Sequence, residues 1–131
     1  MHTAEKLAAT LAANKHVSRV NHPSLPTYPQ KELADRMFGK NGYCAMLSFI
    51  VPEDLEKIDQ FMLALKFPKY APTLGGLHTT LRHPVTSSHR GVPDETRRKM
   101  GITPGMIRVS VGIEDADDLA ADFENALKVF D

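Results

Sequence analysis

The chain has 131 residues, with 16 lysines and arginines against 16 aspartates and glutamates, so its formal net charge is zero when histidine is neutral. This balance argues against a nucleic-acid binder that relies on a basic surface, and the 42% hydrophobic fraction argues against disorder. The length is sufficient for one hydrophobic core, which predicts a single domain over residues 1–131. A lone cysteine, the lack of an apolar signal segment and the lack of a membrane-spanning run predict a cytoplasmic protein.

Regular patterns begin in the first half of the chain. Apolar residues recur every three or four positions between residues 3 and 16, which predicts an amphipathic helix. Three prolines predict an extended connection over residues 22–29, followed by a short helix that ends at Gly39. The nearly continuous apolar run over residues 43–51, interrupted by Ser48, predicts a largely buried strand.

The second half alternates between helical and strand patterns. We expect a helix over residues 53–65 that begins with acidic residues, a short strand over 77–81 and a polar helix over 93–101. Strict alternation over 107–113 predicts a strand with one core face, and a last helix follows over 115–130. The predicted apolar stripes of the four larger helices are Ala4, Leu7, Ala8 and Leu11; Leu33, Ala34 and Met37; Leu55, Ile58, Phe61, Met62 and Leu65; and Leu119, Phe123, Ala126, Leu127 and Phe130. Together these elements predict an α+β fold with helices packed on one face of a sheet.

Arg108 is the most informative residue in these patterns. It falls inside the alternating strand, on the face opposite to Ile107 and Val109, and Ser110 follows on the same face. A guanidinium held on a rigid strand can bind a carboxylate through two parallel hydrogen bonds, each worth roughly 1.5–3 kcal/mol. From the pattern alone, a structural ion pair or a solvated arginine is the simpler interpretation.

Two further segments have local explanations. Residues 73–76 (Thr-Leu-Gly-Gly) predict a turn, because either glycine can take a positive φ and let the backbone approach a ligand or a strand. The segment lacks the spacing of phosphate-binding loops. The acidic run over residues 114–118 predicts a helix N-terminus whose carboxylates accept hydrogen bonds from free backbone amides.

The histidines and the cysteine give no clear metal or nucleophile motif. His78, His83 and His89 fit no zinc spacing, so we expect loop histidines with hydrogen-bond partners and no metal site. Cys44 falls in the predicted strand, where an apolar setting suppresses the thiolate, and is predicted to be a small core residue.

Several motifs gain meaning when they are taken together. They are Asn21-His-Pro-Ser-Leu-Pro-Thr-Tyr-Pro-Gln-Lys-Glu-Leu-Ala34, Met46-Leu-Ser-Phe49, Thr73-Leu-Gly-Gly76, His83-Pro84, Ser88-His89, Gly101-Ile-Thr-Pro-Gly-Met-Ile-Arg-Val-Ser-Val-Gly-Ile-Glu-Asp115 and Asp118-Leu119. In this order they closely resemble the C-terminal end of the Cys/Met metabolism family of pyridoxal-phosphate (PLP) enzymes, the trans-sulfuration group. That group includes cystathionine γ-synthase, cystathionine β- and γ-lyases, methionine γ-lyase and O-acetylhomoserine sulfhydrylase. The resemblance covers nearly the whole chain.

The resemblance implies a fold and a set of site residues. The fold is the small C-terminal domain of the aspartate-aminotransferase-like PLP transferases, with a mainly antiparallel sheet and helices on one face. Arg108 would bind the α-carboxylate of an amino-acid substrate, and the Thr73 hydroxyl would help to place that substrate, supported by the turn at Leu74 and Gly75. No catalytic residue is expected in this chain. The resemblance also implies a homotetramer, and neither nucleic acid nor membrane is an expected partner.

Three positions depart from the family pattern. Thr73 replaces the commoner serine, Pro72 stands where relatives often carry an acidic or aliphatic residue, and Ser87 replaces a frequent methionine. These departures leave the substrate open among cystathionine, methionine and an O-acylhomoserine.

The resemblance also implies a division of labour. The lysine that binds PLP, the aromatic residue stacked on its ring, the aspartate on the ring nitrogen and the phosphate contacts belong to a large domain whose motifs this chain lacks. We therefore expect a PLP-dependent carbon-sulfur lyase or γ-synthase in the intact protein, and no bound cofactor or activity in this chain alone. Two alternatives are a noncatalytic domain that folds and self-associates, and a regulatory module that binds amino acids through Arg108.

Overall fold

Five strands form one sheet in the computed structural model, which describes all 131 residues. They are β1 (Arg19–Asn21), β2 (Met46–Ile50), β3 (Lys69–Tyr70), β4 (Thr80–Arg82) and β5 (Met106–Ser110), arranged in the order β1-β2-β5-β4-β3. β5 pairs with β2 and β4, and β2 pairs with β1, all antiparallel, whereas β3 pairs with β4 in parallel. The prediction of a mainly antiparallel sheet in an α+β fold is confirmed.

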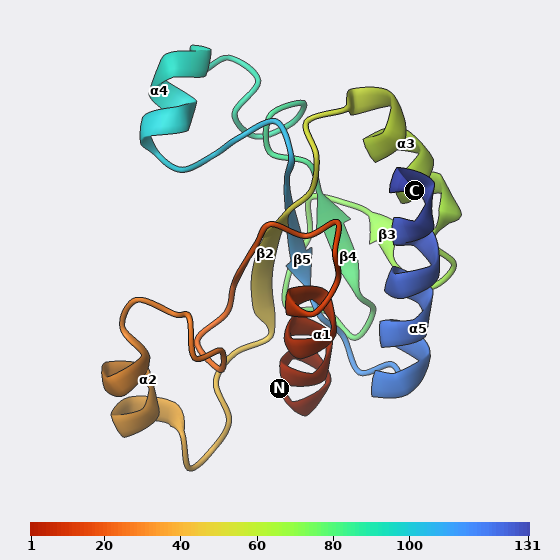
Figure 1. Cartoon of the computed structure of the whole chain (residues 1–131). Helices are drawn as coiled ribbons and strands as arrows, with labels where there is room; N and C mark the ends of the chain where they lie inside the picture. The colour runs from red at the N-terminus through yellow and green to blue at the C-terminus, as the bar shows by residue number, and fades with distance from the viewer.

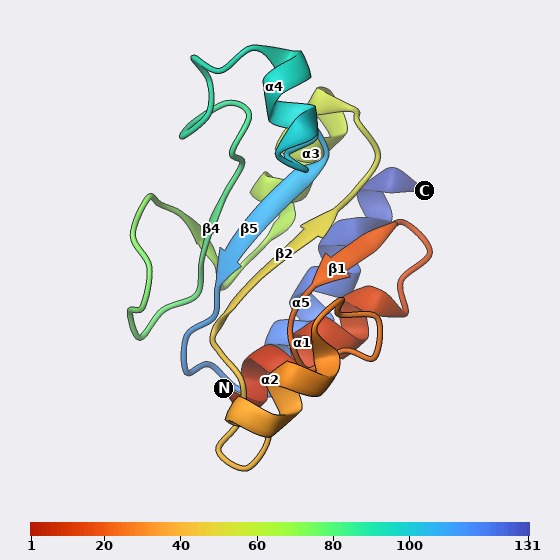
Figure 2. The ribbon, with the colours of Figure 1, turned by 90° about the vertical axis from the view of Figure 1, so that its left-hand side faces the viewer.

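The helices divide into two groups around this sheet. They are α1 (His2–Ala12), α2 (Lys31–Phe38), α3 (Leu55–Ala64), α4 (Asp94–Lys99) and α5 (Ala116–Leu127), and a 3₁₀ turn η1 (Lys128–Phe130) follows α5. Helices α1, α3 and α5 cover one face of the sheet, while α2 and α4 extend away at opposite ends (Figure 1). Figure 2 looks onto the other face, where β2 and β5 lie uncovered between α4 and α2. None of these helices is long and apolar enough to cross a membrane.

The core lies between the sheet and the helices on the covered face. Alternate strand residues such as Phe49 and Ile107 are fully buried there, because successive side chains of a strand point to opposite faces. The rings of Phe49, Phe61 and Phe123 meet at centroid separations of 6.1–6.2 Å. Burial of each such side chain contributes roughly 1.5–3 kcal/mol. The predicted stripes of α1 and α5 are buried in full, which confirms those two helices.

Parts of the other predicted stripes are wrong. Leu33 and Met37 are 38% and 61% exposed, because α2 extends away from the sheet and buries only Ala34. Leu55, at the first turn of α3, is 53% exposed. In both cases the apolar spacing is helical, but the helix or its first turn does not lie against the core.

The strands also differ from their predicted bounds. β4 begins at Thr80 rather than at Leu77, which is 67% exposed in the preceding loop. β2 covers residues 46–50 rather than 43–51, so Cys44 precedes the strand, and its half-buried thiol donates to the carbonyl of Met46. The predicted extended connection holds no strand, but β1 lies just before it, and neither β1 nor β3 was predicted. These two edge strands have three and two residues, too few for an alternating pattern.

Candidate functional site

Arg108 stands in the middle of β5, on the face that α1, α3 and α5 leave open. Its neighbours in the same strand, Ile107 and Val109, are fully buried on the opposite face, as the alternation predicts. Its cross-strand partners are Ser48 on β2 and Arg82 on β4. The side chain of Arg108 is therefore presented from the centre of a rigid, hydrogen-bonded sheet.

Arg108 has no anionic partner within the chain. It takes part in none of the ion pairs, and its Nε is buried without a hydrogen-bond partner. A buried donor left unpaired costs about 1–3 kcal/mol. The interpretation of Arg108 as part of a structural ion pair is therefore wrong, and the guanidinium is free to bind an anion from outside.

The charge of the sheet differs from that of the whole chain. The five strands contain four cationic residues, Arg19, Lys69, Arg82 and Arg108, and no aspartate or glutamate. The strand register places all four on the open face. A chain of zero net charge thus presents a locally positive surface there, which attracts anions.

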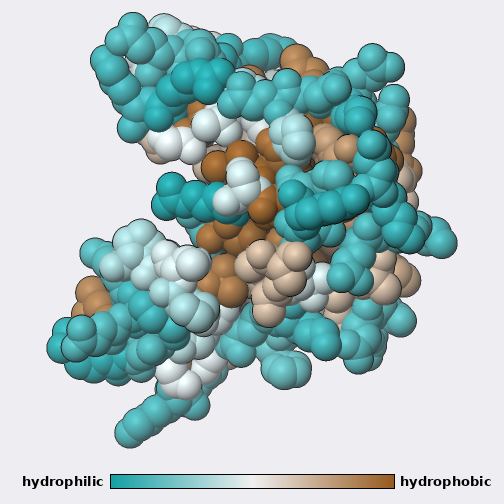
Figure 3. All heavy atoms as spheres, viewed as in Figure 1, coloured by the Kyte–Doolittle hydropathy of each residue, from teal (hydrophilic) through white to brown (hydrophobic).

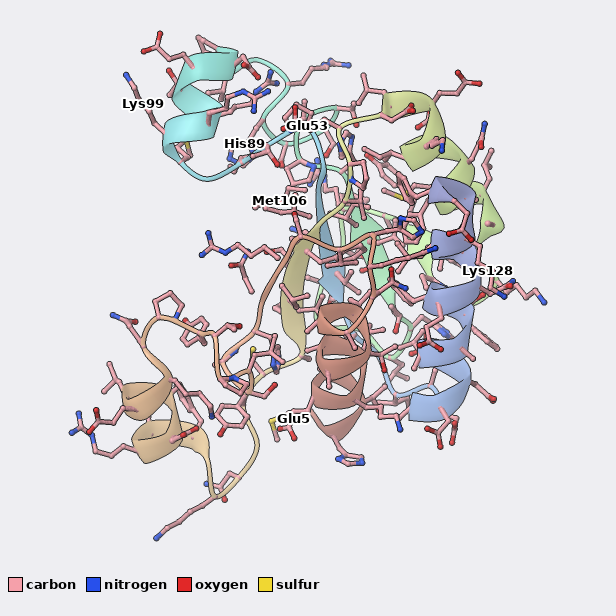
Figure 4. The ribbon with its side chains drawn as sticks, in the orientation of Figure 1. Glu5, Glu53, His89, Lys99, Met106 and Lys128 are labelled. Carbon is pink, nitrogen blue, oxygen red and sulfur yellow. The ribbon has the colours of Figure 1, made fainter.

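A shallow depression of about 250 Å³ adjoins Arg108 on this face. It is lined by Asn21, Met46, Leu47, Ser48 and Arg108. The side-chain amide of Asn21 donates to Ser48 Oγ at 3.0 Å, so the serine hydroxyl proton stays available for a ligand. In Figure 3 the side of the molecule between α2 and α4 is hollowed, with hydrophilic residues in front of apolar residues. Figure 4 places Met106 at the α4 end of this hollow. Sequence reasoning missed Asn21 and Ser48 as site residues, although a lone serine in an apolar run was a usable signal.

A larger groove lies on the helix side of the molecule. It has a volume of about 510 Å³ and runs along the ends of α1 and α5, where Lys15, His16 and Asp131 meet. Asp131 there accepts from Lys15 at 2.8 Å and lies 2.7 Å from His16 Nε2, and both contacts lower the pKa of its side chain to about 2. Because these charges already neutralise one another, the smaller depression at Arg108 is the better candidate site.

The predicted turn over residues 73–76 reaches the same face. The amide of Gly75 donates to Ser110 Oγ at 2.9 Å, two residues along β5 from Arg108. Thr80 Oγ1 donates to the Thr73 carbonyl at 2.9 Å and ties the turn to β4. Gly75 has a φ of 71°, as a turn glycine can, whereas Gly76 does not have a positive φ. The structure therefore brings the turn to β5, while Thr73 and Leu74 remain exposed at its surface.

A second set of hydrogen bonds fastens the end of the turn to the chain after β5. Both carboxylate oxygens of Glu114 accept from Thr79, from its amide at 2.6 Å and from its hydroxyl at 2.7 Å. Thr79 Oγ1 accepts in turn from the Gly112 amide at 2.9 Å. Burial alone would raise the pKa of Glu114, but the hydrogen bonds from Thr79 outweigh it and lower the pKa below its ordinary value. A Cβ at Gly112 would stand 2.3 Å from the Leu77 carbonyl, so only glycine permits this approach.

The acidic run thus has two uses. Asp115 caps α5, since its side chain accepts from the amides of Asp117 and Asp118, which confirms the predicted helix start. Glu114 does not cap the helix. It bonds Thr79, which lies 35 positions earlier, a contact that local spacing does not reveal.

The buried histidines hold backbone segments together. His83 Nε2 donates to the Pro104 carbonyl at 2.6 Å, and its Nδ1 meets Thr86 Oγ1 at 2.9 Å, in agreement with the prediction of a satisfied loop histidine. His22 is fully buried and its Nε2 donates to the Cys44 carbonyl at 3.1 Å. No three histidine, cysteine, aspartate or glutamate side chains come together as metal ligands.

A sequence model of the family described as Cys/Met metabolism PLP-dependent enzymes matches residues 1–128. The chain belongs to this family. It is 37% identical over 126 residues to the chloroplastic cystathionine gamma-synthase 1 of Arabidopsis thaliana, and 40% identical over 126 residues to cystathionine beta-lyase of Bacillus subtilis. Each match covers 96% of this chain, but 22% and 32% of those relatives. The chain therefore spans a third or less of the length of these two family members.

Solved structures of the family share the fold. A cystathionine gamma synthase from Xanthomonas oryzae, crystallised with aminoacrylate and cysteine, has a TM-score of 0.88 and 32% identity to this chain. A putative O-acetylhomoserine (thiol)-lyase from Campylobacter jejuni, with N'-pyridoxyl-lysine-5'-monophosphate, has a TM-score of 0.89 and 31% identity. These matches cover 98% and 97% of this chain, and 33% and 30% of those structures. The predicted family is confirmed.

The residues at the depression fit a carboxylate better than they fit PLP. Arg108 offers one uncompensated guanidinium with a buried, unpartnered Nε, which suits a single anionic group. The depression is open, and no lysine is among its lining residues, whereas PLP needs a lysine and contacts to its ring and phosphate. The lining of this depression therefore does not fit PLP.

Proposed function

We propose that Arg108 binds the α-carboxylate of an amino-acid substrate in a PLP-dependent enzyme that makes or breaks carbon-sulfur bonds. Residues 1–131 would form its C-terminal domain of the aspartate-aminotransferase-like fold. The observation that carries this proposal is the guanidinium without an anionic partner on a sheet face that has no acidic residue. Family membership supplies the reaction class.

The geometry gives Arg108 a positioning task. A guanidinium and a carboxylate form two parallel hydrogen bonds, which fix the direction as well as the position of the ligand. Because the arginine projects from a central strand, the bound amino acid would be held relative to the whole sheet. Such orientation lowers a barrier by removing rotational freedom before the chemical step. Thr73, at the turn fastened to Ser110 through Gly75, would contact the same substrate.

The cofactor would be held by other parts of the enzyme. PLP, when bound, supplies the electron sink for chemistry at the amino-acid carbons. The lysine and ring contacts would come from a separate PLP-binding domain, and this chain alone would be inactive. Association with further copies of the chain, up to a homotetramer, belongs to the same proposal.

Which of the family's reactions the enzyme would catalyse depends on which substrate binds at Arg108. Relatives that match this chain include cystathionine synthases and lyases and an O-succinylhomoserine sulfhydrylase of Mycobacterium tuberculosis, which is 34% identical over 127 residues. These relatives support a sulfur amino acid or an activated homoserine as the ligand at Arg108.

A pair of matched ligands tests the carboxylate assignment. Methionine and methioninamide differ only in the carboxylate, so methionine should shift the NMR signals of the Arg108 side chain and the Ser48 amide, and methioninamide should not. Arg108→Gln should remove the methionine response. Arg19→Gln, which removes an exposed cation from the same face, should keep it. Equal responses to both ligands, or an unchanged response in Arg108→Gln, would contradict the proposal.

Addition of PLP tests the division of labour. After incubation with PLP and removal of the unbound cofactor, the chain should retain no cofactor absorption band and should show no turnover of methionine or cystathionine. A stable band together with turnover would show that the chain alone is a complete enzyme.

A further inference from the structure

Asn41 and Gly42 lie in the connection between α2 and β2. Asn41 is exposed and is the only asparagine of the chain that glycine follows. Its side chain forms no hydrogen bond, whereas the other three asparagines each form one. The amide of Gly42 has no acceptor in the chain, and Gly42 has a φ of 83° and no Cβ to shield its nitrogen. A free carboxamide therefore stands next to an unpaired and unhindered backbone amide.

We propose that Asn41 is a site of spontaneous deamidation. The Gly42 nitrogen attacks Cγ of Asn41, so a bond forms between these two atoms and the bond from Cγ to the side-chain nitrogen breaks. The side-chain nitrogen takes the Gly42 amide proton and leaves as ammonia. Water then opens the cyclic imide at either carbonyl, which gives aspartate or isoaspartate at position 41. The reaction consumes only water, and it is independent of the carboxylate site at Arg108.

The neighbours of Gly42 connect this position to two helices. Gly42 lies against the start of α1, where an added Cβ would stand 3.3 Å from Met1 Cβ and 3.4 Å from Glu5 Oε1. The amide of Tyr43 donates to Glu5 Oε1 at 3.4 Å, and Figure 4 labels Glu5 beside this connection. The Tyr43 hydroxyl donates to Asp35 on α2. Tyr43 therefore fastens α2 to the start of α1.

The two products should affect α2 differently. Isoaspartate routes the backbone through the former side chain and so adds one carbon to the main chain just before Gly42 and Tyr43. Aspartate keeps the length of the main chain. Because α2 buries only Ala34, few other contacts hold it against the molecule. We expect isoaspartate to displace Tyr43 and loosen α2, and aspartate to leave α2 in place.

Mass spectrometry after incubation at mildly alkaline pH tests the site. Trypsin should release peptides 41–57 and 109–128, which report Asn41 and Asn125 separately. Asn125 is also exposed, but it lies within α5, where the next amide is part of the helix. Asn41 should react at nearly the same rate in the folded and the urea-unfolded chain. Asn125 should react at least about tenfold more slowly in the folded chain, since α5 must open first.

The comparison of folded and unfolded chains isolates the contribution of the structure. Asn41→Gln should abolish the mass increase of peptide 41–57, because its attack would need a larger ring. No conversion of Asn41, or protection of Asn41 on folding as strong as that of Asn125, would overturn the proposal.

Hydrogen exchange tests the effect on α2. The isoaspartate form, separated by chromatography, should exchange its α2 amides faster than the unmodified chain. Asn41→Asp carries the same new charge on a main chain of normal length and should exchange like the unmodified chain. Unchanged exchange in the isoaspartate form would show that the connection at Asn41 does not hold α2. Faster exchange in Asn41→Asp as well would assign the effect to charge and contradict the role of main-chain length.

Discussion

The two faces of the sheet are built from alternate residues of the same strands, yet only one of them is completed within the chain. On the covered face, Phe49, Ile107 and Val109 are fully buried against α1, α3 and α5. On the open face, Arg108 and Arg82 face each other without an acid. The covered face is stabilised by apolar burial, which needs no specific partner. The open face keeps charge unpaired, and we propose that the carboxylate of a ligand pairs with that charge there.

The largest expected effect is on the covered face. Phe123→Ala removes a fully buried ring that packs against Phe49 and Phe61, and should lower the free energy of unfolding by about 3–5 kcal/mol. Urea denaturation measures this loss. Leu63→Ala, at an 86% exposed position on α3, is the control and should cost far less. Equal losses in the two variants would mean that the phenylalanine cluster does not dominate the core.

The next effect is on the contacts that fasten the turn beside the open face. Thr79→Val removes a fully buried hydroxyl and leaves Gly112 N and Glu114 Oε2 without their partner, so it should cost about 1–3 kcal/mol. Thr79→Ser keeps the hydroxyl and should lose less. Hydrogen exchange at the Gly112 amide should accelerate in Thr79→Val alone. Unchanged exchange would show that this hydrogen bond does not hold the turn.

A pH effect should come from His22, beside the end of β1. Burial lowers the pKa of His22, although its hydrogen bond to the Cys44 carbonyl acts in the opposite direction. The unfolded chain therefore binds a proton at His22 more readily than the folded one, and stability should fall as the pH drops below about 6.5. Thermal melts at pH values between about 7.5 and 5 should show a smaller decline of the melting temperature in His22→Gln than in the unchanged chain. An identical decline in both proteins would exclude His22 as the cause.

The smallest effect on stability is expected on the open face. Arg108→Gln relieves repulsion with Arg82 and breaks no ion pair, so its free energy of unfolding should change by less than about 0.5 kcal/mol or rise slightly. Urea denaturation of Arg108→Gln and Phe123→Ala under the same conditions compares the two changes in unfolding free energy directly. A loss of more than about 1 kcal/mol would mean that Arg108 supports the fold, and the distinction between the two faces would fail.

Local patterns were sufficient for part of the site. The alternation around Arg108 placed it opposite the core, and the glycines of residues 73–76 marked a turn. The same patterns missed Asn21 and Ser48, because their hydrogen bond joins strands 27 positions apart. They also assigned Glu114 to a helix start, since a nearby helix is visible in the sequence and a distant threonine is not.

The sequence by itself determined the family, the helical stripes of α1 and α5, and the side of β5 on which Arg108 lies, because motifs and periodicity are properties of neighbouring residues. Only the tertiary structure decided which residues meet on the open face. The register of β4 on β5 sets Arg82 against Arg108, and the return of the turn to β5 joins Gly75 to Ser110. Strand register follows from how the covered face packs, so the arrangement of the unpaired charges is fixed by the core on the other side of the sheet.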